Sequence, residues 1–199
     1  MIKFPESKWI FKWGIDQNNA NYIYQHILDT KPKIIIETGT FEGQATYVMA
    51  KACNEVNNNT IIYTIDYDGD PTLYLNNDKW QQLKNIRNCN LQKIKEEFIN
   101  VTVNYIEGDS REVLKTLFIN NNINKIDLFY QDSMHFIEGI QAEWNLVEPY
   151  IQENSYIIFD DLNLKGVQAF KKWFIDKYKK HYSYKDINLG HKQFIVKKN

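Results

Sequence analysis

The sequence of 199 residues contains no apolar run approaching the roughly 18 residues that a membrane-spanning helix needs. Residues 1–19 also lack the long apolar stretch of a secretory signal, because Pro5 and several charged side chains interrupt them. The formal net charge is only −1, so the positive excess of a general nucleic-acid or membrane-surface binder is absent. We therefore expect a cytoplasmic protein with neither nucleic acid nor membrane as a partner.

Cysteine is scarce as well. The sequence has two cysteines, Cys53 and Cys89, and neither belongs to a spacing typical of metal sites. We interpret them as free thiols in a reducing compartment. The chain also has no Gly/Ser linker and no internal repeat, and its length suits one domain. We expect a single domain over residues 1–199, with residues 1–32 as an N-terminal helical segment packed on it.

Short apolar runs alternate with helical patterns along most of the chain. Strands are predicted at residues 33–38, 60–67, 101–109, 125–132 and 155–161, followed by a hairpin at 182–198 that turns near Gly190. Helices are predicted at about 43–53, 80–98, 110–118, 137–150 and 167–180. Continuously apolar strands separated by helices indicate a parallel sheet covered on both faces. We expect an α/β, Rossmann-like, doubly wound sheet of seven strands, mostly parallel, with a C-terminal antiparallel hairpin.

Carboxylates follow every parallel strand of this predicted sheet. They are Glu37, Asp66, Asp109, Asp132, Asp160 and Asp161. Ligands of open α/β sheets bind beyond the carboxyl ends of the strands, so these side chains mark the expected site.

The loop after the first strand, residues 37–43, carries two glycines four positions apart. It lacks the third glycine of a dinucleotide loop, and Gln44 and Ala45 stand where a phosphate-binding loop has Lys and Ser or Thr. Glu37 and Glu42 repel phosphate and attract positive charge, which favours a sulfonium ligand such as S-adenosyl-L-methionine. The alternative is a glycine turn that only lets strand and helix pack closely.

The following strand ends extend this interpretation. Asp66 is placed to accept hydrogen bonds from both ribose hydroxyls, and Asp109 with Ser110 is placed beside an adenine edge. The alternative for Asp109 and Ser110 is helix capping. The candidate cofactor-binding residues are Glu37, Thr38, Gly39, Gly43, Asp66, Asp109 and Ser110.

The motifs "IIIETGTFEGQAT", "YTIDYD", "YIEGDSREVL", "IDLFYQDSMHFIEGIQAEW" and "YIIFDDLNLKGVQAF" occur in that order. This series, over residues 33–174, resembles the class I S-adenosylmethionine-dependent methyltransferases. It is most similar to small O-methyltransferases of the catechol, antibiotic-sugar and cephalosporin-pathway types. The sequence departs from them at Ser133 and Met134, where the family often has Gly and Asp, and it lacks a "PGG" turn before the fifth strand.

The resemblance implies a metal site and a base. Metal-dependent relatives have metal ligands at the positions of Asp132 and of the pair Asp160 and Asp161, and such oxygen donors suit Mg²⁺. His135 stands three residues after Asp132, where the family often places a Lys or His that acts as general base. The candidate catalytic residues are therefore His135 and Asp132. The alternatives are loop capping by Asp160 and Asp161 and a structural His135.

We expect methyl transfer to a hydroxyl oxygen of a small molecule, assisted by Mg²⁺. Two alternatives stay open, which are a metal-independent enzyme acting on nitrogen or carboxylate, and a non-catalytic cofactor-binding module. Trp9, Phe11 and Trp13 either line the acceptor pocket or simply pack on the domain, and residues 66–80 are the other candidate lid. The acceptor and the oligomeric state stay open, with a homodimer as one option.

Overall fold

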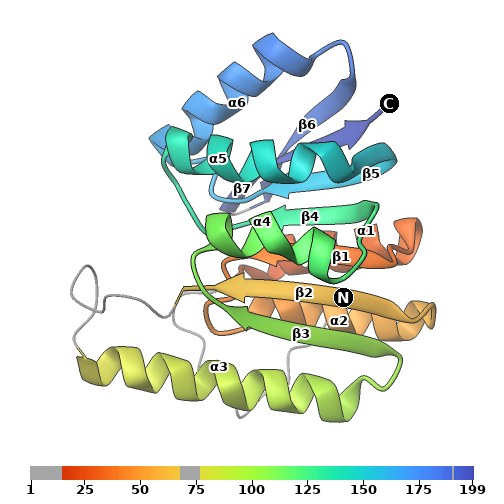
Figure 1. Ribbon diagram of the computed structural model, residues 1–199, viewed down its shortest axis with the longest axis vertical. Coiled ribbons are helices and arrows are strands. Elements are labelled where there is room, and N and C mark those ends of the chain that lie inside the picture. Colours follow the sequence, from red (N-terminus) through yellow and green to blue (C-terminus); the bar gives the residue numbers. More distant parts are fainter. Residues whose placement is uncertain (1–14, 68–76, 190) are drawn as a thin grey trace.

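The chain folds around one seven-stranded sheet with the strand order β3-β2-β1-β4-β5-β7-β6 (Figure 1). The computed structural model describes residues 15–67, 77–189 and 191–199. The strands are β1 Ile34–Thr38, β2 Thr60–Asp66, β3 Val101–Glu107, β4 Ile126–Gln131, β5 Ile151–Phe159, β6 Tyr182–Leu189 and β7 His191–Lys198. Strands β1 to β5 pair in parallel, and β7 runs antiparallel to both β5 and β6. The predicted fold class is confirmed.

Helices connect these strands at places close to the predicted ones. They are α1 Gln17–Thr30, α2 Gln44–Val56, α3 Asn77–Glu97, α4 Ser110–Asn120, α5 Ile137–Val147 and α6 Lys165–Tyr178. The prediction of one helix over residues 137–150 is wrong at its end, because Glu148–Tyr150 forms a 3₁₀ turn. Pro149 explains the change, since proline cannot donate the backbone hydrogen bond that would continue an α-helix.

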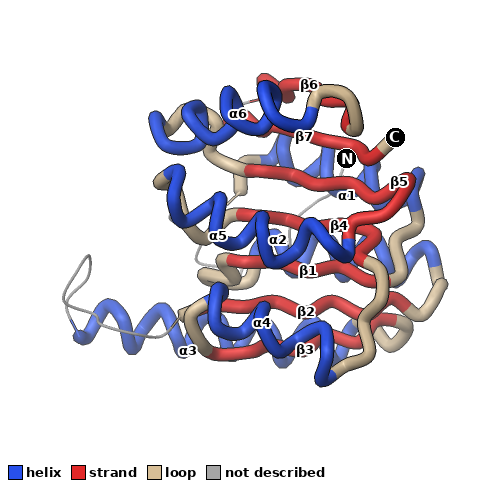
Figure 2. The backbone as a smooth tube through the Cα atoms, turned by 45° about the horizontal axis from the view of Figure 1, so that its top comes forward, coloured by secondary structure: helices blue, strands red, loops and turns tan. Residues whose placement is uncertain are grey.

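The two faces of the sheet are covered by different helices (Figure 2). One hydrophobic cluster joins α1, α2 and α3 to side chains such as Ile35 and Ile62. The other joins α4, α5 and α6 to side chains such as Ile36 and Phe129. Neighbouring residues of one strand thus enter opposite cores, which is why the strands read as continuously apolar.

Three predicted features fall outside the described residues. The aromatic residues Trp9, Phe11 and Trp13 lie there, as do most of the predicted lid and the turn at Gly190. Within the described part of the N-terminal segment, Asp16 caps α1 by accepting hydrogen bonds from the N–H groups of Asn18 and Asn19. The buried side chains of α1 pack into the same cluster as those of α2.

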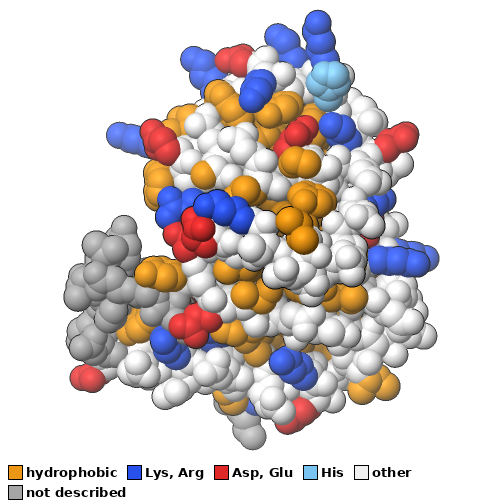
Figure 3. Space-filling model, viewed as in Figure 1, with side chains coloured by type: hydrophobic (Ala, Val, Ile, Leu, Met, Phe, Trp, Pro, Cys, Tyr) orange, Lys and Arg blue, Asp and Glu red, His pale blue; other side chains and the backbone are white. Residues whose placement is uncertain are grey.

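The surface carries charged side chains of both signs (Figure 3), in agreement with the small net charge of the sequence. On the face shown in Figure 3, Lys and Arg side chains are interspersed with Asp and Glu. Among the described residues, no helix is long and apolar enough to cross a membrane.

Trp144 of α5 lies at the centre of an aromatic cluster whose other members come from β5, α6 and β6. Its ring meets Phe174, Tyr178 and Tyr182 edge-on, with centroid separations of 5.0, 5.6 and 5.7 Å. The side chain is fully buried, and its Nε1 has no hydrogen-bond partner among the described residues. Its contribution to stability is therefore mainly that of apolar contact area.

We expect Trp144→Ala to lower the free energy of unfolding by about 3–5 kcal/mol, because the cavity it leaves can close only in part. Trp144→Phe is the control. It retains an aromatic ring and sacrifices no hydrogen bond, so its loss should be clearly smaller. Urea unfolding of the three proteins measures both values, and equal stability of all three would contradict the packing role.

Candidate active site

The glycine loop leaves β1 between β2 and β4 and crosses the carboxyl edge of the sheet. The N–H of Gly39 donates to the carbonyl of Ile65 over 2.8 Å, and the N–H of Asp132 donates to the carbonyl of Thr38 over 2.8 Å. Gly39 has a φ of +92°, and a Cβ atom there would overlap the backbone of Asp132. Gly43 has a φ of +83° at the start of α2. At Gly39, only glycine combines a positive φ with so close an approach to a neighbouring backbone.

Glu37 belongs to β1, next to the start of this loop. Its side chain is fully buried, and its Oε2 accepts a hydrogen bond of 2.5 Å from the Thr46 hydroxyl. Burial raises the pKa of Glu37 to about 7, and the hydroxyls of Thr46 and Thr64 oppose the rise. Glu42 is also largely buried, which raises its pKa. Its backbone carbonyl accepts a hydrogen bond of 2.7 Å from the Asn90 amide.

Asp66 ends β2 and connects the glycine loop to α3. Its Oδ2 accepts a hydrogen bond of 2.6 Å from the N–H of Phe41 and lies 3.4 Å from the guanidinium of Arg87. Arg87 is buried, and its guanidinium carbon lies 4.7 Å from the centroid of the Tyr105 ring. The loop and the carboxylate expected at the ribose are thus fixed to each other.

Asp109 and Ser110 start α4. Asp109 accepts a 2.9 Å hydrogen bond from the N–H of Arg111, and it also pairs with the Arg111 guanidinium, which lowers the pKa of Asp109. Ser110 is buried and donates its hydroxyl hydrogen to Glu143. Asp109 therefore caps α4, as the alternative interpretation predicts, whereas the Ser110 side chain bonds Glu143 and does not cap the helix.

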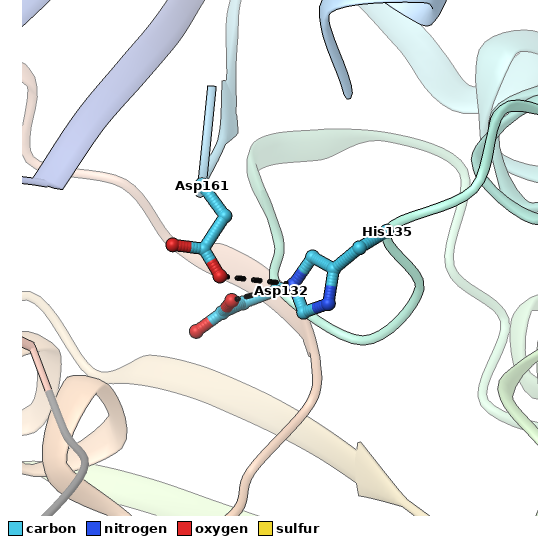
Figure 4. Close-up of side chains that lie close together, drawn as sticks. All are labelled: Asp132, His135 and Asp161. Carbon is cyan, nitrogen blue, oxygen red and sulfur yellow. Dashed lines mark ion pairs between the residues drawn. The ribbon is translucent and has the colours of Figure 1, made fainter. Parts of the chain in front are cut away.

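Asp132, His135 and Asp161 come together at the ends of β4 and β5 (Figure 4). His135 Nε2 lies 3.2 Å from Asp161 Oδ2 and 3.6 Å from Asp132 Oδ1. One donor atom from each of the three residues lies within 4.8 Å of the others. The side chains are 31%, 37% and 25% exposed in chain order. The group is thus open to solvent on one side.

Asp160 differs from the expectation of a third metal ligand at this group. It is nearly buried, accepts a hydrogen bond from the Tyr130 hydroxyl, and accepts another of 2.8 Å from the N–H of Asp161. Asp161 has a φ of +53°, so the chain changes direction between the two residues. The two consecutive carboxylates therefore lie in different surroundings, with Asp160 in the interior and Asp161 beside His135.

The electrostatics of the group reflect burial and crowding of like charges. Burial raises the pKa of Asp132 well above its usual range, and the Asp160 and Asp161 charges add to this while His135 opposes it. Interaction with Asp132 raises the pKa of His135, against the effect of burial. A cation or a proton at this position offsets the repulsion between the carboxylates.

A model of a protein family described as a methyltransferase domain matches residues 36–162, which is more than half of the chain. The chain belongs to this family. It is an S-adenosylmethionine-dependent methyltransferase, as the order of its motifs predicts. The matched range contains the glycine loop, Asp66 and the group of Asp132, His135 and Asp161. A search of curated proteins finds no match.

Solved structures share the fold of this methyltransferase at low identity. A Staphylococcus aureus protein assigned as a caffeoyl-CoA O-methyltransferase has a TM-score of 0.69 and 20% identity over 93% of this chain and 85% of its own. A Bacillus cereus O-methyltransferase in complex with S-adenosylhomocysteine has a TM-score of 0.69 and 13% identity over 93% and 83%. The TDP-rhamnose 3′-O-methyltransferase of calicheamicin biosynthesis has a TM-score of 0.61 and 19% identity. The match covers 90% of this chain and 76% of the other.

The sequence interpretation of the methyltransferase missed Glu143. This residue is fully buried on α5, where its carboxylate accepts hydrogen bonds from the hydroxyls of Ser110, Ser133 and Thr38. The available signal was an acidic residue on the apolar face of a helix, next to Trp144 and one turn from Ile140 and Val147. Such a residue is rarely buried without partners.

The pKa of Glu37 predicts a pH-dependent stability. The folded methyltransferase binds this proton more tightly than an unfolded chain, whose carboxyl has an ordinary pKa of 4.5. The stabilising contribution is therefore complete below pH 4.5 and lost as the pH rises through about 7. We expect Glu37→Gln to remove this part of the loss, which is at most about 3 kcal/mol.

Urea unfolding at pH 5 and pH 8 measures the effect. The matched substitution Glu153→Gln, at an exposed carboxylate of β5, should leave the difference between the two pH values as it is in the native protein. Parallel pH profiles for the native and Glu37→Gln proteins would show that Glu37 does not titrate in this range.

Proposed function

We propose that this methyltransferase transfers the methyl group of S-adenosylmethionine to a hydroxyl oxygen of a small molecule, assisted by a divalent cation. One observation carries the proposal. The group of Asp132, His135 and Asp161 stands directly beside the glycine loop, because Gly39 packs on the backbone of Asp132. A loop suited to a sulfonium cofactor therefore adjoins a group suited to binding and deprotonating a hydroxyl.

The residues of the glycine loop fit the methionine end of the cofactor. Glu42 Oε2 and Gln44 Nε2 are both buried, and neither has a hydrogen-bond partner among the described residues. A buried acceptor and a buried donor without partners are costly to retain. They complement the ammonium and carboxylate groups of a methionine moiety. Glu37 supports this loop from beneath through Thr46.

The rest of the cofactor follows the edge of the sheet in this proposal. Asp66 accepts hydrogen bonds from the ribose hydroxyls, in agreement with its place at the end of β2. Asp109 and Ser110 lie at the start of α4, beside the place proposed for adenine. S-Adenosylmethionine supplies an activated methyl group, so the protein has mainly to orient the acceptor for in-line displacement.

The metal proposal rests on Asp132 and Asp161. Their carboxylates converge and remain partly exposed, which leaves room for water or an acceptor oxygen. Two carboxylates with open positions suit Mg²⁺. A cation bound there lowers the pKa of a coordinated hydroxyl. We leave Asp160 out of this ligand set because Tyr130 and the N–H of Asp161 occupy its oxygens.

His135 is the proposed general base, and Asp132 positions it. The imidazole Nε2 lies within 3.6 Å of both carboxylates. A substrate hydroxyl bound to a cation between these carboxylates would therefore lie near the imidazole. An imidazole accepts a hydroxyl proton near neutral pH. The solved structures named as O-methyltransferases support oxygen as the acceptor atom, and a small-molecule acceptor agrees with the name of the sugar-modifying one.

Cofactor binding is tested by isothermal titration with S-adenosylhomocysteine. We expect Asp66→Asn to weaken binding by about ten- to a hundredfold, because hydrogen bonds to a charged group contribute about 1.5–3 kcal/mol. Asp127→Asn is the control, because Asp127 binds the N–H groups of Lys33 and Ile34 at the opposite end of β1. Absence of binding by the native protein at millimolar ligand would overturn the cofactor proposal.

Metal assistance is tested with a matched pair of variants and a panel of phenol and sugar acceptors. We expect Asp161→Asn to lower Mg²⁺-dependent turnover about a hundredfold or more, since the metal contributes several kcal/mol to the transition state. Asp160→Asn should chiefly lower stability, through loss of the contact with Tyr130.

Two results would change the proposed function. Full activity of the native protein in chelator would remove the metal from the reaction and favour the metal-independent alternative. Cofactor binding without turnover on hydroxyl, amine or carboxylate acceptors would favour a binding module.

A further inference from the structure

Glu143 of α5 is the buried carboxylate with the largest set of hydroxyl partners in the described part of the chain. Its side chain has no solvent exposure, and it accepts hydrogen bonds of 2.6 Å from Ser133 and 3.3 Å from Thr38, as well as one from Ser110. None of the described Lys and Arg side chains forms an ion pair with it. Three hydroxyls and the amide of Gln131, all uncharged donors, therefore satisfy this carboxylate.

The three donors come from three segments that are far apart in the sequence. Thr38 ends β1, Ser110 begins α4, and Ser133 belongs to the turn that follows β4. Each is the direct neighbour of a proposed site residue, because Gly39, Asp109 and Asp132 adjoin them in turn. Glu143 thus contacts residues next to the place proposed for the cofactor and a residue next to the place proposed for the methyl acceptor. It does so from α5, on the face of the sheet that α4, α5 and α6 cover.

We propose that Glu143 is a positioning residue that couples the turn at residues 132–135 to the cofactor loop. The inference rests on the proposed function only in placing S-adenosylmethionine at the glycine loop. Glu143 fixes the hydroxyls of Thr38 and Ser133 to a common acceptor, and so holds Gly39 and Asp132 at a constant separation. Their direct backbone contact then transmits any shift of the turn to the loop.

The physical reason for this coupling is the cost of a buried charge. Burial raises the pKa of Glu143, and hydrogen bonds from Ser110, Ser133, Gln131 and Thr38 lower it again. Removing one donor leaves a buried carboxylate less satisfied, so the remaining donors must reorganise around it. A second interaction holds the turn, since the amide of Gln131 donates to the carbonyl of Met134 over 3.0 Å. The turn therefore responds as a unit.

A purely structural role for Glu143 predicts something different. In that case its loss lowers the melting temperature, while the native fraction binds S-adenosylhomocysteine with unchanged affinity. A positioning role predicts that Ser133, which lies on the turn side, affects cofactor affinity through Glu143. A double-mutant cycle measures that dependence.

The cycle uses Ser133→Ala, Glu143→Gln and the double variant, each titrated with S-adenosylhomocysteine. We expect Ser133→Ala to weaken binding about tenfold in the native background, the equivalent of one hydrogen bond to a charged group. The same substitution should change affinity less than about twofold when Glu143 is already Gln, because Gln carries no charge and has one acceptor oxygen in place of the two of the carboxylate. An equal factor in both backgrounds, or no change in either, would overturn the inference.

Thr38 provides a second measurement in case Glu143→Gln does not fold. Thr38→Val removes the hydroxyl at nearly constant shape, whereas Thr38→Ser retains it. We expect the Val variant to weaken S-adenosylhomocysteine binding severalfold and the Ser variant to restore it, and equal affinities would count against the inference. These readouts need no acceptor. A native protein that binds the cofactor analogue but methylates no hydroxyl would thus refute the proposed function and leave this test intact.

Discussion

The contact between Gly39 and the backbone of Asp132 is the constraint on which the site depends. Parallel pairing of β1 with β4 places Thr38 beside Gln131, so the two strands end at the same edge of the sheet. The positive φ of Gly39 turns the loop over this edge, and the missing side chain lets it rest on Asp132. The glycine loop and the group of Asp132, His135 and Asp161 are therefore adjacent because of the pairing of β1 with β4.

The carboxylates near this edge of the sheet differ in the groups that donate hydrogen bonds to them. Glu37, Asp160 and Glu143 are buried, and each accepts hydrogen bonds from hydroxyls of Thr, Tyr or Ser. Asp132 and Asp161 are partly exposed and share an imidazole. Hydroxyl donors satisfy a carboxylate without adding a competing positive charge. The buried carboxylates can thus hold the framework, while Asp132 and Asp161 remain accessible from solvent.

The sequence allowed the fold to be predicted because apolar runs and helical periodicity report burial directly. It also placed carboxylates at the ends of β1, β2, β4 and β5, since parallel strands end at one edge. It did not tell Asp160 from Asp161, because the left-handed backbone at Asp161 and the partners of the two carboxylates are visible only in the structure. Nor could it show that Glu143 meets Ser110 and Ser133, because those contacts depend on how α5 packs across the sheet.

The turn of residues 132–135 is where this sequence departs from the motifs of the small O-methyltransferases that it resembles. The resemblance leads to the expectation of Gly and Asp where this chain has Ser133 and Met134. A glycine has no hydroxyl to give to Glu143, whereas Ser133 provides one at 2.6 Å. The Met134 sulfur instead lies over Gly139, where a larger side chain would collide with it. The turn of residues 132–135 is thus tied to α5 through Ser133 and Met134.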